Sequence, residues 1–194
     1  MVNESRVLVA YGTKHGATEE IARAIARALT AAHLDVDLRP AGRVGSLDPY
    51  RTVVLGSAVY AGRWRRDAMH LLRRPELGER EVWLFSSGPV GEDSGDPQGQ
   101  ESFTKPRRVK EFAERHGMRE PVVFGGMVDE DAGFIRKRMA RKTPPELRDR
   151  RDWQQIDAWA RSIAATLQGA TGIPAAGGNA PLPVGLETTP RVPS

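Results

Sequence analysis

The sequence predicts an α/β domain with a doubly wound, five-stranded parallel sheet. Short apolar runs alternate with amphipathic helical segments along most of the 194 residues. Such alternation implies right-handed crossovers between parallel strands. Two of the runs, residues 6–11 and 52–57, are largely apolar and rich in β-branched side chains, which is typical of strands buried on both faces. A chain of this length can bury a sizeable core.

Three further strands are expected at residues 34–38, 81–86 and 120–125. Residues 34–38 alternate between apolar and acidic side chains, which predicts a more exposed strand. No helix is evident between the second and third strands, so residues 40–51 are expected to hold only a turn or a short helix. Helices are expected at about 18–32, 65–74 and 104–116, and from Asp152 onward.

Side-chain spacing predicts how the first and last helices begin and pack. Ile21, Ile25 and Leu29 recur every fourth residue and form one apolar stripe, which is expected to face the core. Gln155 follows Asp152 by three residues, the spacing of a capping box at the start of a helix.

The domain is expected to span residues 1–168, with a charged insertion at about 129–151 that includes a helix near 134–142. Residues 88–102 are rich in Gly, Pro, Asp and Glu, which predicts a mobile loop. Residues 169–194 are mostly Gly, Ala, Pro and Thr without periodicity, which predicts a disordered tail.

The composition excludes several classes of function. There is no cysteine, which rules out disulfides and thiol catalysis. The four histidines show no metal-binding spacing, so no metal site is expected. The 29 Lys and Arg only slightly exceed the 25 Asp and Glu, so no nucleic-acid partner is expected. The absence of a bilayer-length apolar run and of an N-terminal signal pattern favours a cytoplasmic protein.

The residues after the first strand have the chemistry of a phosphate-binding loop. Ligands of an open parallel sheet bind at the carboxyl ends of the strands, and the first strand ends at Gly12. Threonine hydroxyls can donate to phosphate oxygens, glycine lets the backbone approach closely, and the amides of the next helix point at the same place. The expected phosphate ligands are Thr13, Lys14, His15, Gly16, Ala17 and Thr18.

Residues 11–19, YGTKHGATE, resemble the phosphate loop of the flavodoxin family. The resemblance implies FMN as the cofactor and a flavodoxin-like strand order, 2-1-3-4-5. His15 and Ala17 stand where the family commonly has threonine and asparagine. One or two side-chain contacts would therefore be missing, whereas backbone contacts would remain. The alternative is an ordinary strand-to-helix turn with Thr18 as the N-cap.

Two further loops are expected to contact the isoalloxazine ring, again by resemblance to the family. The loop after the third strand has two aromatic residues that can stack on the ring, and the loop after residues 81–86 has small residues whose amides can face the ring edge. The first of these loops contributes Val59, Tyr60, Ala61, Gly62 and Trp64. The second contributes Ser87, Gly88 and Pro89. The alternatives are that Trp64 packs against the core and that the second loop is a plain glycine turn.

A narrower resemblance, over about residues 6–168, is to the flavodoxin-like branch that includes menaquinone-dependent protoporphyrinogen IX dehydrogenase. It rests on residues 57–62, SAVYAG, on residues 152–156, DWQQI, and on an insertion before the last helix that is shorter and more polar here. It implies a flavoprotein oxidoreductase with a quinone or another redox partner. Two alternatives stay open: a soluble electron-transfer protein, and a module that has lost FMN or uses a deazaflavin. No catalytic acid or base is identified.

The insertion carries a cluster of basic residues between positions 134 and 151. Only Glu146 and Asp149 oppose them. Unpaired charges are costly to bury, so the cluster is expected on the surface, near the carboxyl edge of the fifth strand. It predicts either a solvated face or contact with an anionic substrate, an acidic protein or the surface of an anionic membrane. The eight basic residues are Arg136, Lys137, Arg138, Arg141, Lys142, Arg148, Arg150 and Arg151.

Overall fold

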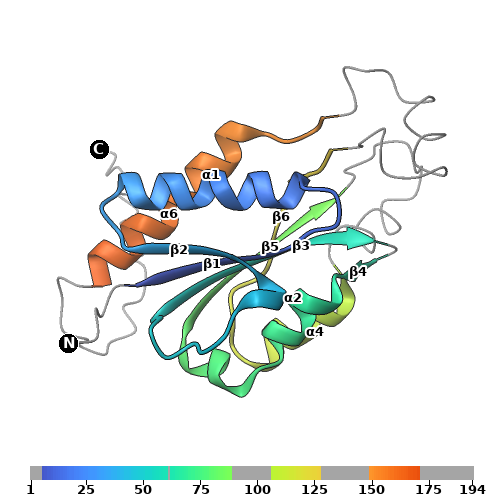
Figure 1. Cartoon of the computed structure of the whole chain (residues 1–194), viewed down its shortest axis with the longest axis horizontal. Helices are drawn as coiled ribbons and strands as arrows, with labels where there is room; N and C mark the ends of the chain where they lie inside the picture. The colour runs from blue at the N-terminus through green and yellow to red at the C-terminus, as the bar shows by residue number, and fades with distance from the viewer. Residues whose placement is uncertain (1–5, 61, 89–105, 128–148, 171–194) are drawn as a thin grey trace, which may run out of the picture.

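The computed structural model describes residues 6–60, 62–88, 106–127 and 149–170. These residues form three layers, with a sheet between two pairs of helices (Figure 1). The loop expected at 88–102, apart from Gly88, lies outside the described residues. So do the helix expected near 134–142 and most of the tail expected at 169–194. The expected start of that tail is wrong by two residues, because the last helix continues through residues 169 and 170.

The sheet joins five parallel strands in the order β2-β1-β3-β5-β6. This order confirms the predicted 2-1-3-4-5 arrangement, because β4 is a two-residue strand, Arg63–Trp64, that pairs antiparallel with the end of β3. β4 could not be predicted from the sequence, since two residues are too few to show a period. The parallel strands are β1 (Val7–Gly12), β2 (Val36–Pro40), β3 (Thr52–Tyr60), β5 (Glu81–Gly88) and β6 (Val122–Gly125).

The central strands are buried on both faces because their side chains alternate between two apolar clusters. In β1, Leu8 and Ala10 join the cluster on one face, whereas Val7 and Val9 join the cluster on the other. This double burial explains why these strands are continuous apolar runs in the sequence. The edge strand β2 is only partly buried, as its alternating pattern predicted.

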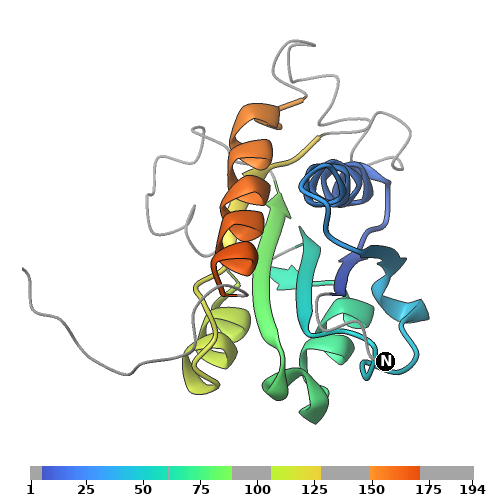
Figure 2. The ribbon, with the colours of Figure 1, turned by 90° about the vertical axis from the view of Figure 1, so that its left-hand side faces the viewer.

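Helices α1 (Ala17–Ala31) and α6 (Trp153–Ala170) cover one face, and α2 (Arg66–Leu72) and α4 (Arg107–Arg115) cover the other (Figures 1 and 2). The predicted stripe of Ile21, Ile25 and Leu29 on α1 is fully buried. Between β2 and β3 the chain has only the 3-10 turn η1 (Ala41–Arg43), as expected, and a second turn, η2 (Pro75–Glu79), precedes β5.

Asp152 is the N-cap of α6, which confirms the prediction from its spacing to Gln155. Its Oδ1 accepts hydrogen bonds from the backbone N–H groups of Gln154 and Gln155, each at 3.0 Å. These bonds satisfy two of the donors that the first turn of a helix leaves free.

Gly56 of β3 is a position where packing leaves no room for a side chain. An added Cβ would lie 1.9 Å from Cζ of Phe85, and that fully buried ring packs against Phe124 and Trp159. Because the ring is enclosed, we expect Gly56→Ala to lower the free energy of unfolding by about 1–3 kcal/mol, measured by urea denaturation.

Gly78→Ala is the control for this substitution, because an added Cβ at Gly78 meets no atom within 4 Å. It should leave the urea midpoint nearly unchanged. A wild-type midpoint for Gly56→Ala would contradict the packing described between β3 and β5.

Candidate functional site

Three loops meet at one edge of the sheet, where β1, β3 and β5 end. The strands are parallel and in register, with Gly12 of β1 opposite Ser57 of β3 and Ser57 opposite Ser86 of β5. Their carboxyl ends therefore lie together, as at the ligand-binding edge of open α/β sheets. The predicted site residues that the structure describes lie in these loops or in the adjoining ends of β3, β4, β5 and α1. Ala61 and Pro89 lie outside the described residues.

Gly16 shapes the first loop and the start of α1. Its φ of 88° lies in the left-handed region that favours glycine, and it is the N-cap of α1 without a side-chain cap. Its N–H donates to Oγ1 of Thr13 at 3.1 Å, which leaves the Thr13 hydroxyl proton for another acceptor.

The amides of the first turn of α1 are the clearest binding feature of this loop. The N–H of Glu20 donates to the carbonyl of Gly16, but the N–H groups of Ala17, Thr18 and Glu19 have no acceptor among the described residues. Free amides at a helix N-terminus, together with the helix dipole, favour an anion.

Thr18 does not cap α1, so the alternative of a threonine-capped turn is wrong. The helix begins at Ala17 after Gly16, which places Thr18 inside the first turn. Its side chain is 1% exposed, and its Oγ1 lies 2.7 Å from Oγ of Ser87. This buried hydrogen bond ties the first loop to the end of β5.

The second loop is a tight hairpin between β3 and β4. Val59 pairs with Trp64 and Tyr60 pairs with Arg63, and Gly62, which precedes β4, has a φ of 68° in the left-handed region that favours glycine. The half-buried Tyr60 ring makes an edge contact with the His15 imidazole, with ring centroids 6.3 Å apart. The hairpin therefore lies against the first loop.

Trp64 is 5% exposed and belongs to the apolar cluster on the α2 face of the sheet. Its indole N–H donates to Oγ of Ser86 at 2.9 Å. Trp64 therefore packs against the core, which was the alternative to a contact with the flavin ring. Tyr60 is the more exposed aromatic side chain of the hairpin and the better placed to meet a ligand.

Serine and glycine residues at the ends of β3 and β5 support the loops. Oγ of Ser57 accepts a hydrogen bond from the N–H of Arg65 at 2.9 Å, and an added Cβ at Gly88 would lie 3.5 Å from Cβ of Val59. Ser57 and Ser86 were not among the predicted site residues. The sequence feature that could have identified them is a hydroxyl side chain at the carboxyl end of an otherwise apolar strand.

Two carboxylates at the start of α1 are paired with arginines. Glu19 binds Arg23 one turn later, and Oε2 of Glu20 lies 2.6 Å from Nη1 of Arg151. Unpaired, both carboxylates would repel an anion at this helix terminus, so the pairing offsets their charge. The pKa of the neighbouring Tyr11 phenol is raised, mainly because the group is partly buried and secondly because the Glu19 carboxylate lies close to it.

Arg151 joins α1 to the end of the charged insertion. Its side chain is 6% exposed, and it binds Oδ2 of Asp149 at 2.6 Å as well as Glu20. Asp149 in turn forms a β-bridge with Met127, just beyond β6. The expectation of a surface charge is therefore wrong for Arg151, because two carboxylates already neutralise it. No local pattern could reveal a pair so distant in sequence. The first six residues of the basic cluster lie outside the described residues.

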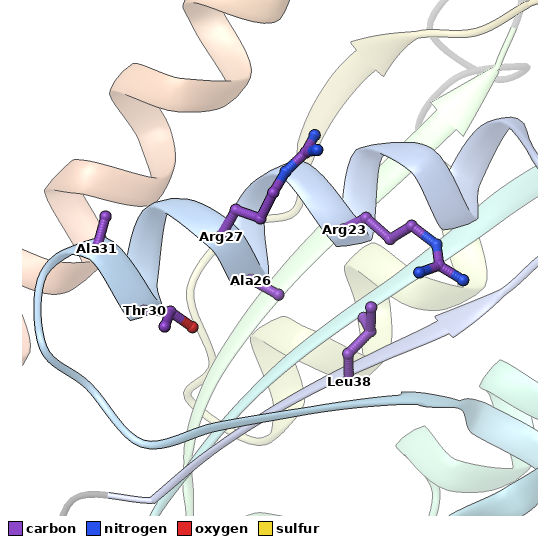
Figure 3. A pocket seen from close by; sticks show the side chains of 6 residues that line it. All are labelled: Arg23, Ala26, Arg27, Thr30, Ala31 and Leu38. Atoms are coloured by element: carbon purple, nitrogen blue, oxygen red, sulfur yellow. The ribbon is translucent and has the colours of Figure 1, made fainter.

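A hollow of about 510 Å³ lies between α1 and the edge strand β2 (Figure 3). Leu38 and Ala26 line it together with Arg23 and Arg27. It runs along the middle and end of α1, away from the three loops, so it is separate from the site. In the described parts of the chain, no group of acidic residues and histidines could hold a metal ion, and no helix is long and apolar enough to cross a membrane.

The fold and the three loops define a flavodoxin-like α/β protein. Residues 8–143 match the family described as the flavodoxin domain. The chain, matched over more than half its length, belongs to this family. The search against curated proteins gave no match.

Several solved structures share the fold. Rubredoxin oxygen:oxidoreductase from Desulfovibrio gigas is 16% identical, with a TM-score of 0.57; the match covers 87% of this chain but only 37% of that protein. A flavodoxin from the domain Archaea is 13% identical, with coverage of 84% and 99% and a TM-score of 0.53. Flavodoxin 2 from Bacillus cereus is 17% identical, with coverage of 85% and 99% and a TM-score of 0.52. At these identities the likeness shows the fold alone.

The ion pairs of Arg151 with Glu20 and Asp149 should make the free energy of unfolding depend on pH. Hydrogen bonds from Arg151 hold the pKa of the Asp149 carboxyl below its ordinary value. Such a carboxylate stabilises the fold above its unfolded pKa of about 3.9, and this stabilisation is lost as the pH falls through the lower folded value. We expect Arg151→Gln to lower the free energy of unfolding at pH 7 by about 1 kcal/mol, since solvent screens the half-exposed carboxylates.

Urea denaturation of the wild type and Arg151→Gln at several pH values measures this effect. The difference between them should shrink below about pH 4. Arg161→Gln breaks an exposed pair with Asp157 and should change stability little at any pH. A difference that is constant with pH, or equal for both variants, would contradict the assigned role of Arg151.

Proposed function

We propose that this protein binds FMN at the three converging loops and acts as an electron-transfer or oxidoreductase module. The N-terminus of α1 carries the proposal, because three free amides and the left-handed Gly16 lie where the loops meet. A compact phosphate suits such a helix terminus. Membership of the flavodoxin-domain family supports FMN over other phosphate-bearing ligands.

The residues of the first loop would hold the phosphate. The Thr13 hydroxyl proton and the amides of Ala17, Thr18 and Glu19 would donate to its oxygens, and the exposed Lys14 would add positive charge. His15 and Ala17 would supply no side-chain contact like those of the family's threonine and asparagine. The backbone donors fit the phosphate without them, since amides bind anions whatever side chain they carry.

The hairpin and the end of β5 would form the site of the ring. Tyr60 would stack on it, while Gly62, Ser87 and Gly88 would leave room at its edge. The buried Thr18–Ser87 bond would hold the phosphate loop and the ring loop at a constant separation. Bound FMN would supply the redox chemistry, and the protein would orient it and limit the access of water.

A narrower candidate is the protoporphyrinogen IX dehydrogenase activity with a quinone acceptor. It is supported by the resemblance of residues 57–62 and 152–156 and by the basic insertion, which could meet an anionic substrate or an anionic membrane. The match of the chain to the flavodoxin domain supports a general role in electron transfer, and it does not point to this one reaction. The loss of FMN, or use of a deazaflavin, is the remaining alternative.

The visible spectrum of the purified protein tests the proposal. Flavin bands, present on purification or after reconstitution with FMN, are the expected result. Their absence after reconstitution would overturn FMN binding and favour the module without FMN. Oxidation of protoporphyrinogen IX with a quinone acceptor would then distinguish the narrower activity from simple electron transfer.

Gly16→Val tests the phosphate loop directly. Valine is strained at a φ of 88°, and its methyl groups would occupy the space where the backbone faces the phosphate. We expect FMN to bind at least about tenfold more weakly, measured by titration of flavin fluorescence.

Gly117→Val is a matched control. Gly117 also has a positive φ, 63°, and open space around an added Cβ, but it follows α4 and lies in none of the three loops. It should lose stability to a similar extent without loss of FMN affinity. Unchanged FMN binding by Gly16→Val, or an equal loss in both variants, would show that the loop assignment is wrong.

A further inference from the structure

A cavity of about 230 Å³ lies on the face of the sheet that α2 and α4 cover. Its lining includes the buried Trp64 and Val109 and the partly buried Met69, so part of the cavity wall is apolar. Four exposed arginines also line it, one from β4, one from the start of α2, one directly after α2 and one from α4. They are Arg63, Arg66, Arg73 and Arg108.

Among the described residues, these four arginines have no carboxylate partner and no acidic side chain lines the cavity. Arginines elsewhere in the described chain are often paired, as in the bonds of Arg23, Arg74, Arg107, Arg119 and Arg151 with carboxylates. Like charges that converge without a counter-charge repel one another. A bound anion would relieve this repulsion.

The N-terminus of α4 opens on the same cavity. Pro106, the N-cap of α4, lines it, and the helix has neither a side-chain cap nor an acidic residue in its first turn. Val109 and Lys110 donate to the carbonyl of Pro106, but the N–H groups of Arg107 and Arg108 have no acceptor among the described residues. The positive end of this helix therefore adds to the charge of the arginines.

We propose that this cavity binds a small anionic ligand, a phosphate or carboxylate group on an apolar body. Guanidinium groups match the planar geometry of carboxylates and the oxygens of phosphates, and the partly buried Met69, with the edges of Trp64 and Val109, would offer apolar contact to the rest of the ligand. The cavity is smaller than the roughly 300–1,000 Å³ of pockets for larger ligands. It therefore suits a small molecule or the anionic end of a larger one.

The cavity borders the hairpin that is proposed to meet the flavin ring. Gly62 and Arg63 line it, and Arg63 pairs with Tyr60. Anion binding rests on the described residues alone and does not depend on FMN. A role as the substrate site beside the ring rests in addition on the proposed function.

Isothermal titration of the full chain with phenyl phosphate tests the site. We expect saturable binding that is stronger than that of inorganic phosphate, because the ring adds apolar contact. The double variant Arg66→Gln/Arg108→Gln should bind at least about tenfold more weakly. It should keep the wild-type urea midpoint, since both side chains are exposed. The control pair Arg27→Gln/Arg51→Gln removes the same charge from exposed positions outside the cavity.

Each outcome of the titration decides the proposal. No saturable binding of phenyl phosphate up to about 10 mM would overturn it. An equal loss of affinity for phenyl phosphate in the control pair would also overturn it, and would indicate binding elsewhere, for example at the hollow that Arg27 lines. Binding that depends on Arg66 and Arg108 in a protein that takes up no FMN would leave this site established and refute only the proposed function.

Discussion

Burial of β1, β3 and β5 on both faces governs both the packing of the domain and the placement of its polar groups. It restricts the middle of these strands to apolar side chains or glycine and leaves polar side chains to the strand ends. The buried hydroxyls of Ser57, Ser86 and Ser87 lie at those ends, and each has a hydrogen-bond partner in another segment. The same bonds that satisfy these groups also hold the three loops together, so stability and site geometry share one set of contacts.

Positive charge is distributed unevenly around this framework. At the start of α1, Arg23 and Arg151 are engaged by carboxylates, so the proposed binding capacity there rests on backbone amides. At the cavity between α2 and α4, the lining arginines have no carboxylate partner among the described residues, and α4 begins without a side-chain cap. The two proposed sites would therefore favour anions by different means, and residues of both contact or belong to the hairpin that carries Tyr60.

Much of the fold could be predicted because its signals are local. Doubly buried strands are apolar runs, the α1 stripe repeats every fourth residue, and Asp152 caps α6 at a recognisable spacing. The loop proposed to bind phosphate could be predicted because parallel strands bring their carboxyl ends to one edge. Its detail was less accessible: the sequence allowed Thr18 as a cap, whereas Gly16 occupies that position and Thr18 turns toward Ser87.

The α/β class, the succession of the main helices and strands and the position of the loop proposed to hold phosphate could all be inferred from the amino-acid sequence. Each of these follows from hydrophobic period and turn chemistry within a few neighbouring residues. The inward packing of Trp64, the pairing of Arg151 with Glu20 and Asp149, and the gathering of four arginines around one cavity are evident in the folded structure alone. These contacts join segments far apart in the chain, and they depend on how crossovers bring helices over the sheet, which no local pattern encodes.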